Sequence, residues 1–192
     1  MTTPTIQKIA AAAARILHKE GTEGVTMRRV TAAVGISPMA LYRHYPNREG
    51  LLNALADAGF AALADRLANT RPTGRVDRQL STVLDVFLDF AFEEPRLFEL
   101  MFLSMREGAR TFPDDFQARR SPTANVFADI IARAMESGHF RKDDEWEIVF
   151  ETGALLQGLV MLYLGGRVRM SPEQFRAFCH RSFGRYLNGL RS

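Results

Sequence analysis

The chain has 192 residues, of which 46% are hydrophobic, 10% aromatic and 24% charged. This composition is typical of folded globular proteins and excludes disordered and fibrous classes, and the length fits one or two domains. A single cysteine, Cys179, excludes both an intramolecular disulfide framework and a metal site built on several thiolates. We therefore expect a reducing, cytoplasmic setting.

The distribution of charge is more informative than the formal net charge of +3. Residues 1–48 hold seven basic side chains against Glu20 and Glu23, a net charge of +5, whereas the rest of the chain carries a net charge of −2. This asymmetry favours a basic module for a polyanion joined to a larger, near-neutral body. A random fluctuation in composition is the alternative.

Apolar residues recur at helical spacing along most of the chain, and we find no repeat, low-complexity tract or strand pattern. The first run extends from Ile6 to Leu17 and ends at Gly21. A helix over 27–34 follows Thr26, a very short helix begins at Pro38, and Asn47 can cap a fourth helix of about five turns.

Longer and more apolar helices are predicted after a break at 69–74. They cover residues 75–94, 95–105, 123–136, 143–164 and 171–190, with a loop over 106–122 that can hold one short turn. The chain is thus predicted to be all-α, with about nine helices. The longest uncharged apolar stretch extends only over 152–164. Since roughly 20 residues are needed to span a bilayer, we expect no membrane helix, and the first residues do not have the pattern of a secretory signal.

The window over residues 24–52 has the pattern of a helix-turn-helix, whose second helix enters the major groove of DNA. A small apolar seam fixes the angle between the two helices; it consists of Val30, Ala33, Val34, Ile36 and Leu41. The residues left for the outer face are Ser37, Pro38, Met39, Ala40, Arg43 and His44. Free backbone amides at the start of the second helix favour phosphate.

This window resembles the DNA-binding domain of TetR-type bacterial transcriptional repressors. The resemblance rests on TMRRVTAAVGIS followed by LYRHYPNREGLL near the N-terminus. It implies a helix-turn-helix DNA-binding domain over residues 1–48, a connecting helix over 49–69 and a helical ligand-binding and dimerisation domain over 70–192. A regulator of this kind, usually a repressor, binds a palindromic operator as a homodimer and is released by a small-molecule effector.

Carried over residue by residue, the resemblance implies phosphate contacts from Thr26, Tyr42, His44 and Arg48, with Arg28 or Arg29 adding charge. It implies base contacts from Ser37, Pro38, Met39, Ala40 and Arg43, although the family often has small polar residues or glycine at the positions of Pro38 and Met39. Arg43 can read guanine with two hydrogen bonds, and Met39 and Ala40 can pack on thymine methyl groups. A solvated surface position is the alternative for each residue, and Tyr45 is predicted to be buried.

The helical body carries aromatic residues and flexible methionines on adjacent helices, which is how pockets between bundle helices are usually built. We therefore predict an apolar or aromatic effector, bound by Phe87, Phe90, Phe98, Met101, Phe102, Met105, Trp146, Phe150 and Gln157. Asp89 and Tyr163 are further candidate polar anchors. Ordinary core packing is the alternative for each of these residues.

The helix over 143–164 is apolar on nearly all sides and contains small residues that allow close approach, so it needs a second buried face. Together with the last helix it predicts a twofold homodimer. The predicted interface consists of Leu155, Gly158, Leu159, Leu162, Phe175, Phe178, Cys179, Ser182, Phe183 and Tyr186. A central helix buried inside a monomer is the alternative.

Nothing in the sequence indicates catalysis, a metal or a cofactor. Cys179 and His180 are neighbours, so on a helix their side chains diverge by about 100° and cannot form a nucleophile–base pair. The four histidines lie far apart, without the spacing of metal ligands. A helical protein–protein adaptor without DNA affinity is the alternative function, and salt-dependent binding of duplex DNA would separate it from a regulator.

Overall fold

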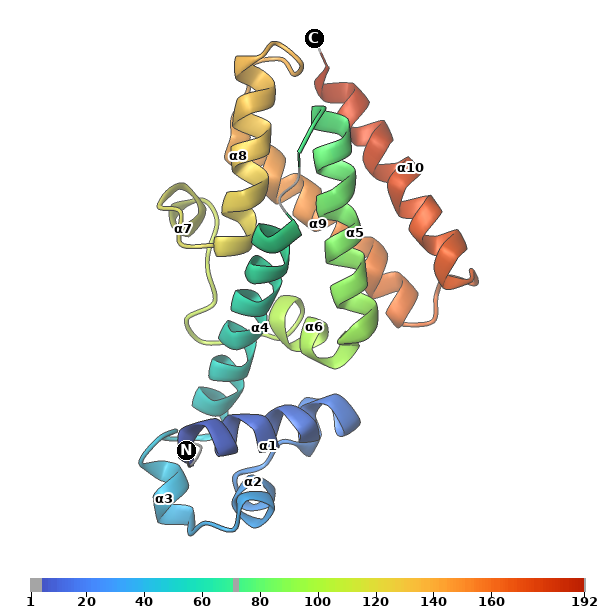
Figure 1. The fold of residues 1–192 in the computed structure, drawn as a ribbon. Helices are drawn as coiled ribbons and strands as arrows, with labels where there is room; N and C mark the ends of the chain where they lie inside the picture. The colour runs from blue at the N-terminus through green and yellow to red at the C-terminus, as the bar shows by residue number, and fades with distance from the viewer. Residues whose placement is uncertain (1–4, 71–72, 192) are drawn as a thin grey trace. The chain divides into compact units, whose positions relative to one another are not determined.

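The computed structural model describes residues 5–70 and 73–191, and the regular elements of these residues are all helical (Figure 1). The elements are α1 (Thr5–Glu20), a 3₁₀ turn η1 (Thr22–Gly24), α2 (Met27–Val34), α3 (Pro38–Tyr42), α4 (Arg48–Thr70), α5 (Val76–Glu93), α6 (Pro95–Phe102), α7 (Asp114–Gln117), α8 (Pro122–Glu136), α9 (Glu145–Leu164) and α10 (Pro172–Leu190). The all-α prediction is confirmed. The helix beyond the predicted nine is α7, a single turn inside the predicted loop. Residues 1–4, 71–72 and 192, which the predicted domain ranges include, lie outside the described residues.

Polar side chains at the N-termini explain where several helices begin. Thr26 accepts a hydrogen bond from the amide of Arg29 (3.3 Å), and Asn47 Oδ1 accepts one from the amide of Gly50 (2.7 Å), as predicted for a capping residue. Ser171 and Gln174 form a capping box at α10. The helix predicted to reach residue 105 instead ends at Phe102.

The chain forms two compact units that do not follow the order of the sequence. Unit 1 comprises residues 1–60 and 94–109, and unit 2 comprises residues 61–93 and 110–192. The helix α6 therefore belongs with the N-terminal helices, although the segment 61–93 of unit 2 precedes it in the chain. The sequence-based boundaries after residues 48 and 69 do not anticipate this arrangement and stay a prediction about domains.

The core of unit 1 lies along the inner side of α1, where Ile9, Ala13 and Leu17 are buried. This helix packs against α2 and against α6. Gly59 of α4 is also in close contact with α6, because a Cβ atom there would lie 2.5 Å from the sulfur of Met101. A Cβ atom at this point would force the Met101 side chain to move, so glycine favours the close approach of the two helices.

In unit 2, α9 packs against α8 and α10, and α5 packs against α8 and α10. Each helix supplies a stripe of buried residues at spacings of four: Leu80, Leu84 and Leu88 on α5, and Phe175, Cys179, Phe183 and Leu187 on α10. This burial corrects part of the predicted dimer interface. Phe175 and Cys179 are 0% exposed and Phe183 is 3% exposed, so their side chains fill the core of their own chain and offer no surface to a second copy.

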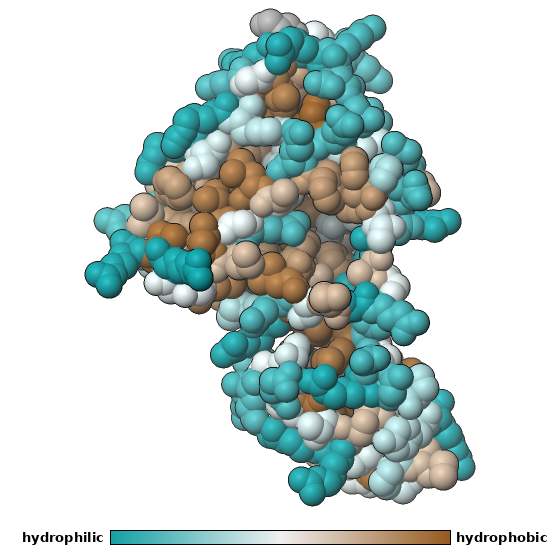
Figure 2. Space-filling model, turned by 180° about the vertical axis from the view of Figure 1, so that it is seen from behind, coloured by the Kyte–Doolittle hydropathy of each residue, from teal (hydrophilic) through white to brown (hydrophobic). Residues whose placement is uncertain are grey.

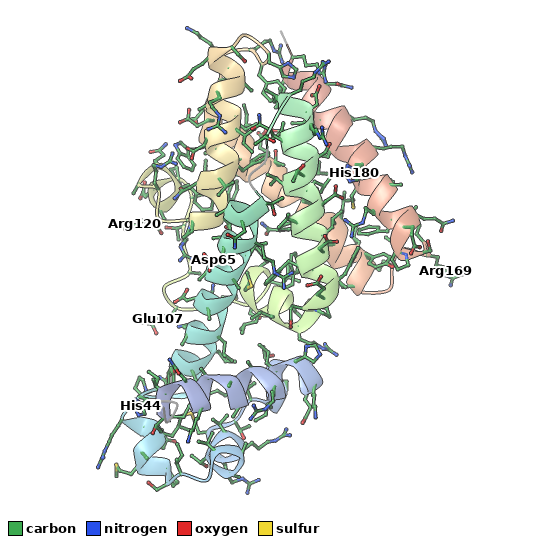
Figure 3. All side chains as sticks on the ribbon, in the orientation of Figure 1. His44, Asp65, Glu107, Arg120, Arg169 and His180 are labelled. Carbon is green, nitrogen blue, oxygen red and sulfur yellow. The ribbon has the colours of Figure 1, made fainter. Side chains whose placement is uncertain are left out.

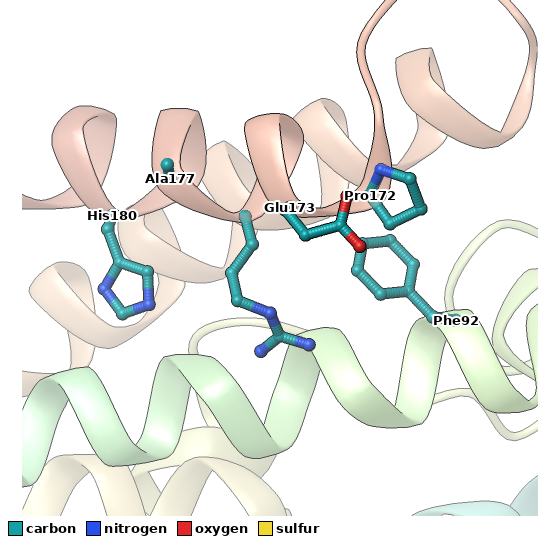
Figure 4. A pocket seen from close by; sticks show the side chains of 6 residues that line it. Phe92, Pro172, Glu173, Ala177 and His180 are labelled. Carbon is teal, nitrogen blue, oxygen red and sulfur yellow. The ribbon is translucent and has the colours of Figure 1, made fainter.

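A groove of about 360 Å³ lies between α5 and α10, with Phe92 and Pro172 at one end and His180 at the other (Figure 4). Arg176 lines this groove, and its guanidinium is already paired, because it donates to Asp85 (2.9 Å) and to Asp89. The ring of His180 lies 2.8 Å from the same Asp85 oxygen. These charged groups hold α10 against α5. Asp89 is paired with Arg176, and its role as an effector anchor stays a prediction.

The helix α9 has more apolar surface than the other helices of unit 2 cover. By length and composition it is long enough to cross a membrane, yet only 28% of its most apolar 18-residue window is buried. One such helix is weak evidence for a membrane segment, because core helices of other proteins pass the same test. The surface seen from behind shows a broad apolar area over the part of the molecule that holds unit 2 (Figure 2). The exposed apolar side chains of α9 are Phe150, Met161, Leu162 and Leu164.

The buried thiol of Cys179 provides a test of the α10 core. Burial raises the pKa of Cys179 to about 11, so at pH 8 only about one thiol in a thousand is ionised, and a solvent-borne reagent must also wait for the core to open. We expect the native protein to resist alkylation by iodoacetamide at pH 8, and the urea-unfolded chain to react readily, as measured by intact mass. Phe175→Ala, which removes a buried ring one turn away, is expected to cost about 3–5 kcal/mol and to accelerate labelling. Equal labelling of native and unfolded chains would contradict this core.

Candidate nucleic-acid interface

The helices α2 and α3 are joined by a tight turn whose geometry depends on Gly35. This residue has φ 75° and ψ 36°, the left-handed region that side-chain-bearing residues rarely adopt. Ser37 then caps α3 by accepting a hydrogen bond from the amide of Ala40 (3.2 Å). The predicted helix-turn-helix is present, with a recognition helix of five residues.

The buried side of this helix pair is narrower than the predicted apolar seam. Val30 and Leu41 are both 0% exposed. Val34 and Ile36 are half-buried, whereas Ala33, which was assigned to the seam, is exposed. The packing of the pair therefore centres on Val30 and Leu41.

The outer face of α3 is open to solvent. Met39 is 68% exposed and Tyr42 is 49% exposed. The other predicted base-reading positions are exposed as well, except for Ala40, which is half-buried: these are Ser37, Pro38 and Arg43. His44 is exposed directly after the helix (Figure 3), whereas Tyr45 is buried, as predicted. Burial raises the pKa of the Tyr45 hydroxyl.

The basic side chains near this face divide into two groups. Arg28 and Arg43 are exposed and take part in no ion pair within residues 5–70 and 73–191. Arg29, by contrast, donates two hydrogen bonds to the carboxylate of Glu20 and one to the carbonyl of Gly24 (3.2 Å). The guanidinium lowers the pKa of Glu20 through these bonds. Arg29 therefore adds no uncompensated charge, and Arg28 is the better candidate for the flank.

Arg48, predicted to contact phosphate, is occupied inside the unit. Its Nε donates to the carbonyl of Val25 (2.8 Å) and its Nη2 donates to the carbonyl of Thr22 (2.6 Å). Glu23 lies 3.5 Å from Nη2. The sequence did not predict that Glu20 pairs with Arg29 and Glu23 with Arg48. Helical spacing predicts contacts within one helix, not contacts between separate segments.

The predicted effector-binding residues are divided between the two units. Unit 1 holds Phe98 and Met101, which are buried, and Phe102, whose ring lies 4.7 Å from that of Phe98. Met105 does not share their helix and is fully exposed. Unit 2 holds the remaining residues, Phe87, Phe90, Trp146, Phe150 and Gln157.

Most of the unit 2 residues are engaged in packing. Phe90 is 1% exposed beneath the guanidinium of Arg66, and Trp146 is 8% exposed beneath that of Arg119. Phe150 is 44% exposed and stacks on Phe112, with 4.4 Å between ring centroids. Tyr163, a candidate polar anchor, stacks on the buried ring of Phe175 at 4.1 Å.

Comparison with known proteins gives a family for both parts of the chain. Residues 9–55 match the description "Bacterial regulatory proteins, tetR family". Residues 80–186 match "Tetracyclin repressor-like, C-terminal domain". The protein described as "Uncharacterized HTH-type transcriptional regulator YobS", from Bacillus subtilis (strain 168), is 27% identical over 103 residues, which are 54% of each chain. The aligned part thus spans about half the length of that relative.

Two solved structures extend the likeness over nearly the whole fold. A protein of unknown function from Rhodococcus sp. RHA1 has a TM-score of 0.80 at 22% identity, covering 100% of this chain and 97% of its own. The transcriptional regulator FadR from Bacillus subtilis, solved in complex with stearoyl-CoA, has a TM-score of 0.73 at 14% identity, covering 97% of this chain and 100% of its own. At these identities the likeness shows the fold alone.

Proposed function

We propose that this chain, which belongs to the tetR family of bacterial regulatory proteins, represses transcription as a homodimer on a palindromic DNA operator. A small, largely apolar effector releases the DNA. The observation that carries the proposal is the open outer face of α3, with Met39 and Tyr42 exposed beside Arg43 in the basic N-terminal part of the chain. Regulation of this kind takes place in the cytoplasm and requires no catalysis.

In this proposal α3 lies in the major groove. Met39, the most exposed apolar residue of the helix, packs on a thymine methyl group, and Arg43 reads guanine. Tyr42, His44 and Arg28 are placed to contact the phosphate backbone around the groove. Two copies related by a twofold axis need two half-sites about one helical turn, or a multiple of it, apart.

The proposed dimer interface centres on the uncovered face of α9. Met161 and Leu162 are 48% and 38% exposed, and Leu155 and Leu159 are half-buried beside them. A Cβ atom at Gly158 would have no neighbour within 4 Å, which leaves room for a second helix to approach closely. From α10, the half-buried Phe178 and Ser182 can join this face, whereas Tyr186 already donates to Glu151 of its own chain (2.6 Å).

We propose a largely apolar effector because aromatic side chains gather on α6, where the ring centroids of Phe98 and Phe102 lie 4.7 Å apart. Phe98 and Phe102 are the aromatic side chains that we assign to it. The FadR structure with stearoyl-CoA shares the fold and gives a first compound to test. An effector can release DNA only if its affinity differs between the DNA-binding conformation and another one.

Sequence-specific DNA binding is tested with a fluorescein-labelled duplex enriched from a random pool by the wild-type protein, and with a scrambled duplex of equal composition. We expect Arg43→Gln to weaken binding to the selected duplex by about tenfold or more, because one bidentate base contact contributes about 1–3 kcal/mol. Arg133→Gln, an exposed arginine of α8, is the charge-matched control and should change nothing. Equal affinities of the two variants would contradict base reading by Arg43. An adaptor would show no salt-dependent binding of either duplex by any of the proteins.

The dimer is tested by sedimentation velocity at micromolar concentration. We expect the wild type to sediment as a dimer and Leu162→Glu as a folded monomer, because the new carboxylate would be desolvated in the interface without a partner. Leu103→Glu is the matched control, since Leu103 is 37% exposed and Leu162 is 38% exposed. A wild-type monomer, or equal behaviour of the two variants, would contradict the α9 interface.

Effector coupling is tested by titrating stearoyl-CoA with and without saturating selected duplex. We expect the duplex to weaken stearoyl-CoA binding by about 5–150-fold, and stearoyl-CoA to weaken duplex binding by the same factor, because coupling between two ligands is reciprocal. Coenzyme A without the acyl chain is the control and should bind weakly. Identical stearoyl-CoA affinities in both titrations would rule out the acyl thioester as the effector.

A further inference from the structure

Arg48 is the first residue of α4, and its side chain reaches back to the turn between α1 and α2. It donates from Nε to the carbonyl of Val25 (2.8 Å) and from Nη2 to the carbonyl of Thr22 (2.6 Å). These bonds join α4 to a segment from which it is separated in the chain by α2 and α3. Hydrogen bonds from a cationic donor are about twice as strong as those between neutral groups.

The segment that Arg48 holds is the entry to the helix-turn-helix. Val25 is 0% exposed and directly precedes Thr26, the residue that caps α2. From the other side Arg29 of α2 donates to the carbonyl of Gly24 (3.2 Å). Two arginines from different helices therefore bind three carbonyls of one short segment, Thr22 to Val25, which we call the α1–α2 clamp.

We infer that Arg48 is a positioning residue, which supports DNA reading by fixing α2 and α3 relative to α4 through the α1–α2 clamp. This inference rests on the proposed DNA-binding function and departs from the phosphate contact expected at this position. Moving the guanidinium to a phosphate would remove the charged donor from two backbone carbonyls at once. Glu23, 3.5 Å from Nη2, also offsets the positive charge that a phosphate would meet.

The chemistry of the clamp makes lysine a poor substitute for arginine. A guanidinium presents several N–H donors in a rigid planar fork, and two of its nitrogens bind two separate carbonyls here. A lysine ammonium is a point charge that can contact a phosphate as well as arginine can, but it cannot reproduce this fork. Arg48→Lys therefore separates the two roles, whereas Arg48→Gln removes both.

The experiment measures the affinity of the full-length wild type, Arg48→Lys, Arg48→Gln and Arg43→Gln for the selected and scrambled duplexes over a series of salt concentrations. Circular dichroism melting checks that each variant is folded at the assay temperature. For a positioning residue we expect both Arg48 variants to lose about tenfold in the ratio of selected to scrambled affinity. The slope of log affinity against log salt on the scrambled duplex should stay at the wild-type value, because no phosphate contact is lost.

Two results would overturn the inference. If Arg48 contacts phosphate, Arg48→Lys keeps wild-type affinity, and Arg48→Gln changes the salt slope by about 2, roughly 0.9 for each copy in the dimer. If the residue is merely structural, both duplexes weaken equally at an unchanged slope and the selectivity ratio does not move. Failure of the proposed function looks different from either, because the wild type itself would then bind neither duplex.

Discussion

Unit 1 depends on apolar burial that its own N-terminal helices cannot supply. A helix-turn-helix of fewer than about 50 residues buries little surface and is marginal by itself. The helix α6, contributed from the middle of the chain, adds the buried residues Phe98 and Met101, and it packs on α1 and on α4 at Gly59. The segments that directly precede and follow residues 94–109 belong to unit 2. The stability of unit 1 therefore depends on a helix that reaches it only after the chain has passed through unit 2.

Local structure could be predicted from the sequence because its causes are local. The limits of α2 follow from a capping threonine and a glycine with positive φ, and Asn47 caps α4 as expected. The placement of α6 could not be predicted, since helical spacing shows that a face is buried but not which helix covers it. The contacts of Arg48 could not be predicted for a similar reason, because its partners are backbone carbonyls of a distant part of the chain, before α2.

The two helices expected to form the dimer interface differ in a way that composition does not reveal. On α10 a single stripe that includes Phe175 and Phe183 is buried in the core, and the opposite side carries Arg181 and Arg185. On α9 the apolar residues continue around the helix, and only 28% of its most apolar 18-residue window is buried. An ordinary amphipathic helix and a helix with two apolar faces thus give similar sequence patterns, and the burial within one chain separates them.

The ion pairs in the structure show which basic residues among residues 1–48 can attract a polyanion. The net charge of +5 is unchanged, but both acidic residues form ion pairs: Glu20 with Arg29, and Glu23 with Arg48. The remaining basic residues are exposed and take part in no ion pair within the described part of the chain: Lys8, Arg15, Lys19, Arg28 and Arg43. The two paired arginines are part of the framework, because Arg29 donates to Glu20 and to the carbonyl of Gly24, and Arg48 donates to the carbonyls of Thr22 and Val25. The field that attracts a polyanion therefore arises from α1, the start of α2 and the end of α3, while the proposed role of Arg48 is to support the geometry in which α3 is presented to DNA.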